Sequence, residues 1–315
     1  MLVTMKEILD NANAGGYAVI APNVGHELNT RPVIEAAEEL NSPLIIDVAY
    51  CQTSDIVLFG TYLCELAKRS TVPIAINLDH GGSSLAPFEE VLKQVLEAMQ
   101  AGFTSIMADR SAMPYEQNKD EVKRLVDIAR LVNVSVEAEL GHVGSASKYN
   151  DIGNVVYTDP LMAKDFIDST GIDALAVSIG TAHGAYKDEK PVIDFYRLQE
   201  IKDATQFPLV LHGGSGTGDE QLQRVCKSGI NKVNISHDLH RVACEAVKNY
   251  DTSGNGAYQI YALIQKAIKT RMKELIILSG SEGKAWKVPA QGVGKSMLAI
   301  IPEHIKRIYG DPIQV

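Results

Sequence analysis

The chain is poor in cysteine and contains no long apolar run. Its four cysteines form no Cys-x-x-Cys pair, which excludes a cysteine-based zinc knuckle and a disulfide framework. We expect buried, reduced thiols at Cys51, Cys64, Cys226 and Cys244. No stretch approaches the ~18 consecutive apolar residues of a membrane span, and the first residues lack the basic and apolar segments of a signal peptide. These absences predict a cytoplasmic protein that contacts no membrane.

The chain also has no excess of positive charge. The chain has 39 acidic and 30 basic residues, a formal net charge of -9, and its basic residues are scattered rather than clustered. A surface of this kind does not attract nucleic acid or anionic lipid, so we expect a small-molecule substrate and no nucleic-acid partner. With 315 residues and no linker, repeat or low-complexity tract, the chain has the length of one large α/β domain.

Short apolar runs alternate with helical patterns along the chain. Runs that are apolar on both faces are typical of parallel strands covered by helices on both sides. Eight such alternations predict an α/β fold, namely a (β/α)8 TIM barrel, with an open doubly wound sheet as the alternative. The expected strands span residues 18–24, 43–48, 73–78, 105–108, 135–140, 174–179, 208–211 and 232–235. The expected helices include residues 32–40, 88–101, 119–131 and 160–170.

The end of the chain exceeds what a barrel needs. A helical pattern spans residues 258–278, and the residues after 280 match no barrel element. We expect residues 1–285 to form a single catalytic barrel domain, and residues 286–315 to form a C-terminal extension that packs on the barrel or on a partner subunit. Residues 141–155 form another long segment, rich in small residues, which suits either an active-site lid or an ordinary surface loop.

Three histidines occupy the same position relative to their expected strands. His80, His183 and His212 each close an apolar run, and each precedes a glycine. The carboxyl ends of barrel strands open onto one face, so these imidazoles converge if their strands are neighbours. Three histidines form a common zinc site that leaves one coordination position open. One such histidine alone would more often be an ordinary strand-end residue, but three in the same context predict a catalytic zinc.

Carboxylates follow the same strands. Asp79 directly precedes His80, so it would lie near the metal, either as an acid-base group or as a residue that orients His80. Asp109 and Glu139 end the next two expected strands and add negative charge at the same face. They would be partners of the ligands, alternative ligands or ordinary polar residues of the barrel mouth.

A phosphate anchor is predicted beside His212. The segment 213–216, Gly-Gly-Ser-Gly, joins a strand to a helix, and backbone amides in such a turn bind phosphate. Lys187 would add positive charge, and Asn234 at the end of the eighth strand would complete the site. Zinc, a carboxylate and a phosphate anchor together suit aldol chemistry on a small phosphorylated ketone. The metal would polarise the carbonyl, so that the neighbouring carbon releases a proton.

Several longer motifs surround these residues. They read Leu78-Asp-His-Gly, Gly102-Phe-Thr-Ser-Ile-Met, Val136-Glu-Ala-Glu-Leu-Gly, Gly180-Thr-Ala-His-Gly-Ala-Tyr-Lys, Leu209-Val-Leu-His-Gly-Gly-Ser-Gly and Gly280-Ser-Glu-Gly-Lys. With these motifs the chain closely resembles the class II ketose-bisphosphate aldolases, the fructose- and tagatose-bisphosphate aldolase family. The resemblance extends from the first residues to about Ala285.

The resemblance implies a set of site residues. It implies a zinc ion held by His80, His183 and His212, with Asp79 exchanging a proton with the aldol hydroxyl. It also implies homodimers or homotetramers and, for many members, a monovalent cation, Na+ or K+. Asp109 and Glu139 would border the metal. The phosphate of dihydroxyacetone phosphate would be held by Gly184, Lys187, Asn234 and the 213–215 turn, Gly213, Gly214 and Ser215.

The chain departs from the family pattern around the substrate. Ser236 and His237 stand where the family has a small or acidic residue and a phosphate-contacting threonine, so we expect them in an altered donor site. Tyr258 stands where the family has an arginine that reaches the acceptor phosphate of a neighbouring subunit. Because this guanidinium is missing, we expect the acceptor aldehyde to be unphosphorylated or to carry a carboxylate. Arg110 is a candidate for a new contact with it.

Two questions stay open. The acidic pair of the family's lid loop is replaced by Ser147 and Lys148, which leaves the base for the enediolate step unassigned, with Asp151 as a candidate. The substrate also allows alternatives. An ordinary fructose- or tagatose-1,6-bisphosphate aldolase would share these motifs, and another zinc-dependent barrel enzyme, a hydrolase or isomerase, would share the metal site. A non-catalytic subunit is disfavoured, because Asp79 and the three histidines are all intact.

Overall fold

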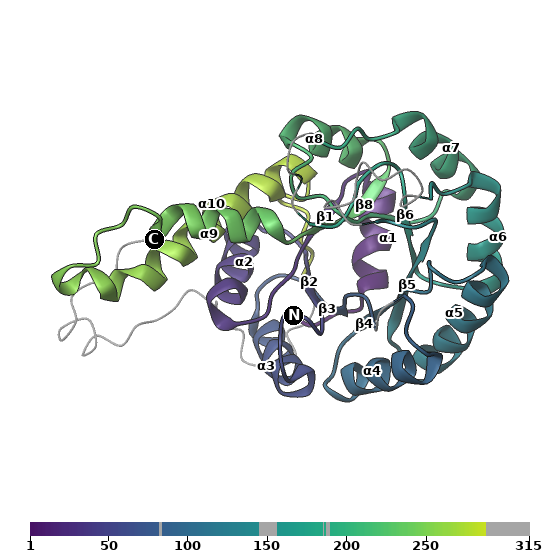
Figure 1. Ribbon diagram of the computed structural model, residues 1–315, viewed down its shortest axis with the longest axis horizontal. Helices are drawn as coiled ribbons and strands as arrows, with labels where there is room; N and C mark the ends of the chain where they lie inside the picture. The colour runs from purple at the N-terminus through teal and green to yellow at the C-terminus, as the bar shows by residue number, and fades with distance from the viewer. Residues whose placement is uncertain (82–83, 145–155, 185, 187–189, 288–315) are drawn as a thin grey trace.

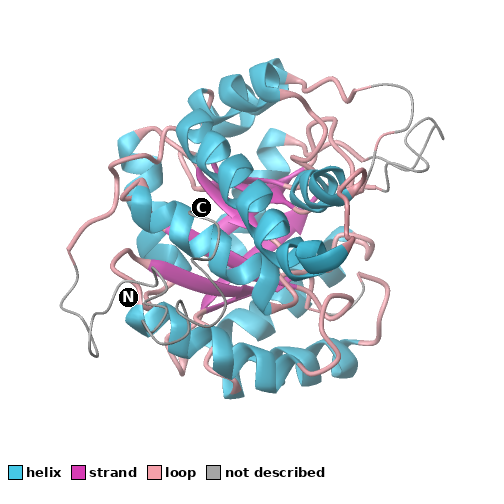
Figure 2. Ribbon diagram, turned by 90° about the vertical axis from the view of Figure 1, so that its left-hand side faces the viewer, coloured by secondary structure: helices cyan, strands magenta, loops and turns pink. Residues whose placement is uncertain are grey.

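Parallel strands wrapped by helices form a barrel (Figures 1 and 2). The structure, a computed structural model, describes residues 1–81, 84–144, 156–184, 186 and 190–287. The strands are β1 (Val19–Pro22), β2 (Leu44–Val48), β3 (Ile74–Leu78), β4 (Ser105–Ala108), β5 (Ser135–Leu140), β6 (Ala174–Val177), β7 (Leu209–Leu211) and β8 (Ile230–Ile235).

The sheet is nearly closed on itself. Its strand order is β1-β8-β7-β6-β5-β4-β3-β2, and every pair in it is parallel. Between the two ends of this order, the N–H of Val24, just past β1, donates to the carbonyl of Asp47 in β2 over 2.9 Å. The predicted (β/α)8 TIM barrel is therefore confirmed, and each of the eight expected apolar runs overlaps a strand.

The helices lie around the strands, apart from α1. They are α1 (Met5–Gly15), α2 (Glu27–Glu39), α3 (Ile56–Arg69), α4 (Phe88–Gln100), α5 (Tyr115–Arg130), α6 (Pro160–Thr170), α7 (Phe195–Thr205), α8 (Asp219–Lys227), α9 (His237–Val247), the 3-10 helix η2 (Gly254–Gln259) and α10 (Ile260–Ser279). Helix α2 begins before the expected residue 32 because Asn29 caps its first turn, accepting from the N–H of His26 over 3.2 Å. Strand β8 begins at Ile230, before the expected residue 232. The sequence pattern did not show this start, because Asn231 and Lys232 interrupt the apolar run.

The barrel interior changes from apolar to polar along the strands. Helix α1 packs under the amino ends of the strands, where Met5 and Leu9 are buried against inward-facing residues such as Ile45, Ala75 and Val210. Side chains of a strand alternate between its two faces, so the residues two and four positions later also face inward. These inward-facing positions are polar or charged, and they form the floor and wall of the site described below: Asp47, Asn77, Asp79, Asp109, Glu137, Glu139, His212, Lys232 and Asn234.

The last described segment runs from the outside of the barrel to its amino end. Helices α9 and α10 lie side by side and project from the barrel, with α10 packed on α2 (Figure 1). After α10, Trp286 packs against the apolar cluster around α1, and its Nε1 donates to Glu7 Oε1 over 3.1 Å. Residues 288–315, most of the predicted extension, lie outside the described part of the chain.

The cysteine prediction is half right. Cys64 and Cys226 are buried, as expected, but Cys51 and Cys244 are exposed. Cys51 lies in the loop after β2 at the barrel mouth, and Cys244 lies on the projecting helix α9, so neither is covered by the packing between strands and helices. Among the described helices, none is both long and apolar enough to span a membrane.

Candidate metal centre and active site

The three predicted histidines converge at the carboxyl end of the barrel. They come from the loops after β3 and β6 and from the end of β7. The ring centroids of His80 and His183 are 4.9 Å apart, those of His80 and His212 are 4.9 Å apart, and those of His183 and His212 are 5.3 Å apart. One nitrogen of each ring lies within 4.8 Å of a nitrogen of the other two. The long spacing in the sequence thus becomes one compact cluster.

Backbone geometry brings these loops together. His80 has a φ of 48°, in the left-handed region that few non-glycine residues adopt, and this turns the chain directly after β3. Gly213 has a φ of 66°, and a Cβ there would lie 2.3 Å from the carbonyl oxygen of Ala182. The hydroxyl of Thr181 donates to the carbonyl of His212 over 2.7 Å. The loops after β6 and β7 are therefore in close contact, which places His183 beside His212.

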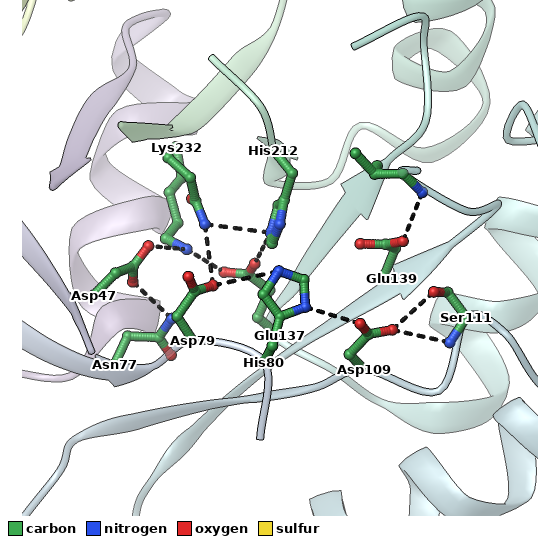
Figure 3. A network of polar contacts seen from close by, with 12 residues as sticks. Asp47, Asn77, Asp79, His80, Asp109, Ser111, Glu137, Glu139, His212 and Lys232 are labelled. Atoms are coloured by element: carbon green, nitrogen blue, oxygen red, sulfur yellow. Dashed lines mark hydrogen bonds and ion pairs between the residues drawn. The ribbon is translucent and has the colours of Figure 1, made fainter. Parts of the chain in front are cut away.

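Carboxylates determine which ring nitrogens face the cluster. Nδ1 of His80 lies 2.8 Å from Asp109 Oδ2, and Nε2 of His212 lies 2.9 Å from Glu137 Oε1 (Figure 3). Because a carboxylate only accepts, we assign the proton to these two nitrogens, which leaves lone pairs on His80 Nε2 and His212 Nδ1. His212 Nδ1 and His183 Nε2 are buried and have no hydrogen-bond partner among the described residues. Together, His80 Nε2, His183 Nε2 and His212 Nδ1 form a set of three nitrogens that fits a divalent metal of the zinc type.

The electric field at the cluster favours a cation. Burial lowers the pKa of His80, but the negative charges of Asp79 and Asp109 outweigh it and raise this pKa to about 10. Burial and the neighbouring histidines lower the pKa of His183 to about 3, so this ring is neutral, as a metal ligand must be. A field that holds a proton on His80 also holds a metal ion in its place.

Glu139 lies on the other side of His80 from Asp79. Its Oε1 accepts from the N–H of Val143 over 2.9 Å, while its buried Oε2 has no partner among the described residues. Burial raises the pKa of Glu139 to about 8, and the negative charge of Asp109 adds to this effect. Oxygens of Asp109 and Glu139 lie within 4.8 Å of a His80 nitrogen. Of the roles predicted for Asp109, orienting His80 is the one that this geometry favours.

Asp79 is buried and held in place through both of its oxygens. Asn23 Nδ2 donates to Asp79 Oδ2 over 2.7 Å, and Asn234 Nδ2 donates to Asp79 Oδ1 over 3.2 Å. Oδ1 of Asp79 lies 3.9 Å from His80 Nε2. Burial raises the pKa of Asp79, but the positive charges of His80 and Lys232 outweigh it and hold the pKa below its usual range. Asp79 is therefore ionised, and each of its oxygens, which accepts one amide donor, keeps a lone pair that can accept a proton.

A cavity of about 350 Å³ opens above these residues. Its lining includes the predicted substrate-binding residues Gly184, Gly213, Ser215, Asn234, Ser236 and His237. Ser215 Oγ accepts from the N–H groups of Ser236 and Asp238, over 3.1 and 3.2 Å, and thus joins the loop after β7 to the start of α9. Gly214 is not among the residues that line the cavity, and it packs against β8, where a Cβ would lie 2.6 Å from Val233. Lys187 lies outside the described residues.

Other predicted contacts fall elsewhere. Arg110 is 1% exposed, pairs with Glu121 of α5 and donates to the carbonyl of Ala86 over 2.8 Å. The suggestion that Arg110 contacts the substrate is wrong, because its charge is already neutralised inside the protein. Tyr258 is 80% exposed in η2 and does not line the cavity of its own chain. The lid residues Ser147, Lys148 and Asp151 lie outside the described residues.

Four site residues were missed by the sequence interpretation. Asn23 holds Asp79. Glu137 holds His212, and Lys232 pairs with both Glu137 and Asp47 (Figure 3). A signal for them was present, because charged residues inside otherwise apolar strands are seldom buried without a partner. Burial raises the pKa of Glu137, but the charge of Lys232 outweighs it and lowers this pKa.

Comparisons with known proteins agree with the geometry. The family model of class II fructose-bisphosphate aldolase matches residues 3–284. The structure of the YdjI aldolase from Escherichia coli K12 is 34% identical in sequence, with a TM-score of 0.78, and the match covers 91% of this chain and 100% of that chain. Fructose-bisphosphate aldolase from Campylobacter jejuni shares the fold at 22% identity, with a TM-score of 0.75 over 90% of this chain and 97% of that chain. The chain belongs to the class II fructose-bisphosphate aldolase family and is a carbon-carbon lyase.

Proposed function

We propose that the protein is a zinc-dependent aldolase that reversibly cleaves a ketose phosphate to dihydroxyacetone phosphate and an aldehyde. The convergence of His80, His183 and His212, with Asp79 beside them in one cavity, is the observation that carries this proposal. Zinc bound by the three free nitrogens would act as a Lewis acid toward the substrate carbonyl. Class II aldolases generally depend on zinc, and the donor set found here suits that metal.

Asp79 would carry the proton of the aldol hydroxyl. In the cleavage direction its carboxylate accepts this proton while the carbon-carbon bond breaks, and in the condensation direction it returns the proton. Asn23 and Asn234 hold both carboxylate oxygens and so fix the direction in which the free lone pairs point. The low exposure of Asp79, 5%, keeps bulk water from competing for the same proton.

The donor phosphate would lie at the loops after β6, β7 and β8. Gly184 has a φ of 100°, and no atom of the described residues lies within 4 Å of where a Cβ would be, so these residues leave room for a ligand to approach its backbone closely. Gly213, Ser215, Ser236 and His237 border the same cavity, and the amino end of α9 adds a favourable dipole for an anion. We propose that Lys187 and a monovalent cation, Na+ or K+, complete this site.

The aldehyde would be unphosphorylated or carry a carboxylate. Among the described residues, no lysine or arginine lines the cavity. A phosphorylated acceptor would need a strong cation there, since guanidinium and ammonium groups are the usual phosphate partners. In a homodimer or homotetramer, which we also propose, η2 of a neighbouring subunit would offer Tyr258, a side chain without charge. An ordinary fructose- or tagatose-1,6-bisphosphate aldolase is the alternative for this acceptor site.

The test is a condensation assay. Zinc-loaded protein is mixed with dihydroxyacetone phosphate and a panel of aldehydes, phosphorylated and unphosphorylated, with and without a chelator. We expect chelator-sensitive condensation with preference for an unphosphorylated aldehyde. Preference for glyceraldehyde 3-phosphate would support the ordinary bisphosphate aldolase. Zinc binding without condensation of any aldehyde would contradict the proposal and favour a hydrolase or isomerase.

A further inference from the structure

We propose that Lys232, at the bottom of the site, is a positioning residue for the metal ligand His212. Its ammonium group holds the Glu137 carboxylate in the orientation that keeps His212 Nδ1 unprotonated and turned toward the metal. This inference rests on the proposed zinc site, but it concerns residues that do not touch the substrate. It assigns a second role to a buried charge that also helps to keep Asp79 ionised.

The geometry of this chain of contacts is direct (Figure 3). Lys232 Nζ lies 2.8 Å from Glu137 Oε2 and 3.1 Å from Asp47 Oδ2. Glu137 Oε1 lies 2.9 Å from His212 Nε2. The side chains of Lys232, Glu137, Asp47 and His212 are all 0% exposed. Water therefore cannot replace any of these contacts, and each group depends on its protein partner.

The two oxygens of Glu137 have separate partners. Lys232 is a donor only, so it occupies Oε2 and leaves Oε1 for His212. Oε1 then accepts the Nε2–H of His212, which places the lone pair on Nδ1 at the metal side of the ring. Without the ammonium group, the carboxylate would be free to rotate and would no longer hold this ring orientation. Partners behind metal-binding histidines typically change metal affinity by about 10- to 100-fold when they are removed.

A second lysine provides a matched control. Lys269 of α10 also bridges two carboxylates, Glu39 at 2.9 Å and Glu35 at 3.3 Å on α2, and it is 8% exposed. Its pairs lie outside the barrel, between two helices, and contact no histidine of the cluster. Both lysines therefore pair with two carboxylates, but only Lys232 has a partner, Glu137, that contacts a histidine of the cluster.

The first experiment compares zinc affinities by competition with a chromophoric chelator. We expect Lys232→Met to lower zinc affinity at least tenfold and Lys269→Met to leave it within twofold of the wild type. Asp47→Asn, which keeps the contact between Lys232 and Glu137, should also leave it within threefold. Equal losses in Lys232→Met and Lys269→Met would show a general effect of lost stability and would overturn the proposal.

Lys232→Met leaves two carboxylates buried without their cation, so a second variant guards against failure to fold. The double variant Asp47→Asn with Lys232→Met removes one carboxylate together with the lysine, and its folding is checked by circular dichroism and thermal unfolding. We expect this variant also to lose zinc affinity at least tenfold. Zinc affinity within twofold of the wild type in the folded double variant would overturn the proposal.

The ring itself gives a readout that does not depend on activity. Long-range proton–nitrogen NMR of histidine-labelled, zinc-free protein distinguishes the two neutral forms of His212, whose signal is identified by its loss in His212→Gln. We expect the proton on Nε2 in the wild type and a mixture of both forms in the folded double variant. A proton on Nδ1 in the wild type would contradict the proposal. Absence of aldolase activity with these readouts intact would instead refute only the proposed reaction.

Discussion

The inner wall and the outer rim of the cavity are built differently. On the inner wall, Asp79, His212 and Glu137 are buried, and each has its position set by a charged or amide partner. On the rim, Cys51 and His237 are exposed and lie in a loop and at the start of a helix. Both groups line or support the same cavity. The difference indicates that residues of the rim can be replaced with little loss of stability. An exposed side chain leaves no buried partner unsatisfied when it is replaced.

This contrast agrees with the departures from the family pattern. The histidines and Asp79 match the family motifs, whereas the unusual residues Ser236, His237 and Tyr258 are at the rim or fully outside the cavity. The inner wall therefore supports chemistry shared with the family, and the rim is where we propose that substrate selection differs. If this division holds, replacements on the inner wall should lower turnover or zinc affinity, and replacements at the rim should change substrate binding.

Replacement of Asp79 should have the largest effect. Asp79→Ala removes the proposed proton carrier but no metal ligand, so we expect turnover to fall by about 100-fold or more, the usual range for a positioned acid or base. Zinc content, measured by atomic absorption, should be unchanged. Unchanged turnover would refute the assignment of Asp79. Loss of zinc together with turnover would show that Asp79 belongs to the metal site instead.

Replacement of Asp109 should act on the metal rather than on the proton transfer. Asp109→Ala removes the acceptor that orients His80, 2.8 Å from Nδ1, and we expect zinc affinity to fall by about 10- to 100-fold. Ser111→Ala is the control, because it removes only a hydroxyl that donates to Asp109 over 2.8 Å. It should change zinc affinity by less than about threefold, because Asp109 Oδ2 keeps its contact with His80 and the N–H of Ser111 still donates to Asp109 Oδ1. Equal effects of the two variants would contradict the orienting role.

Replacement of His237 should alter donor binding without altering stability. His237→Ala removes an exposed imidazole from the proposed phosphate site, so we expect the KM for dihydroxyacetone phosphate to rise about fivefold, or ~1 kcal/mol, with kcat nearly unchanged. His237→Thr restores the hydroxyl expected in the family and should recover part of this loss. An unchanged KM in His237→Ala would remove His237 from the donor site.

Replacement of Cys51 should have the smallest effect. Cys51→Ser keeps the size of an exposed side chain, so both turnover and the free energy of unfolding should stay within ~0.5 kcal/mol of the wild type. A bulky thiol reagent should nevertheless inhibit the wild type, because Cys51 lines the cavity, and should spare the Cys51→Ser variant. Equal inhibition of both would show that modification of another thiol, such as exposed Cys244, is responsible.

The limits of the sequence interpretation follow from particular residues. The alternation of apolar runs with helical patterns predicted the barrel, because a strand covered by other elements on both faces is apolar along its whole length. It did not predict the inward-facing Glu137 and Lys232, because their role depends on each other across the barrel rather than on neighbours in the chain. Arg110 was misassigned for the same reason, since its partner Glu121 lies on the following helix.

The sequence by itself determined the fold class, the zinc-binding residues that we propose and the family, because each of these depends on local patterns and short motifs. Only the tertiary structure decided which nitrogen of His80 and of His212 is left for a metal, because the carboxylates that orient these rings come from other strands. It also decided that Asp79 is held by Asn23, just after β1, and by Asn234 in β8. Closure of the barrel brings these distant residues into contact, and burial makes their pairing obligatory.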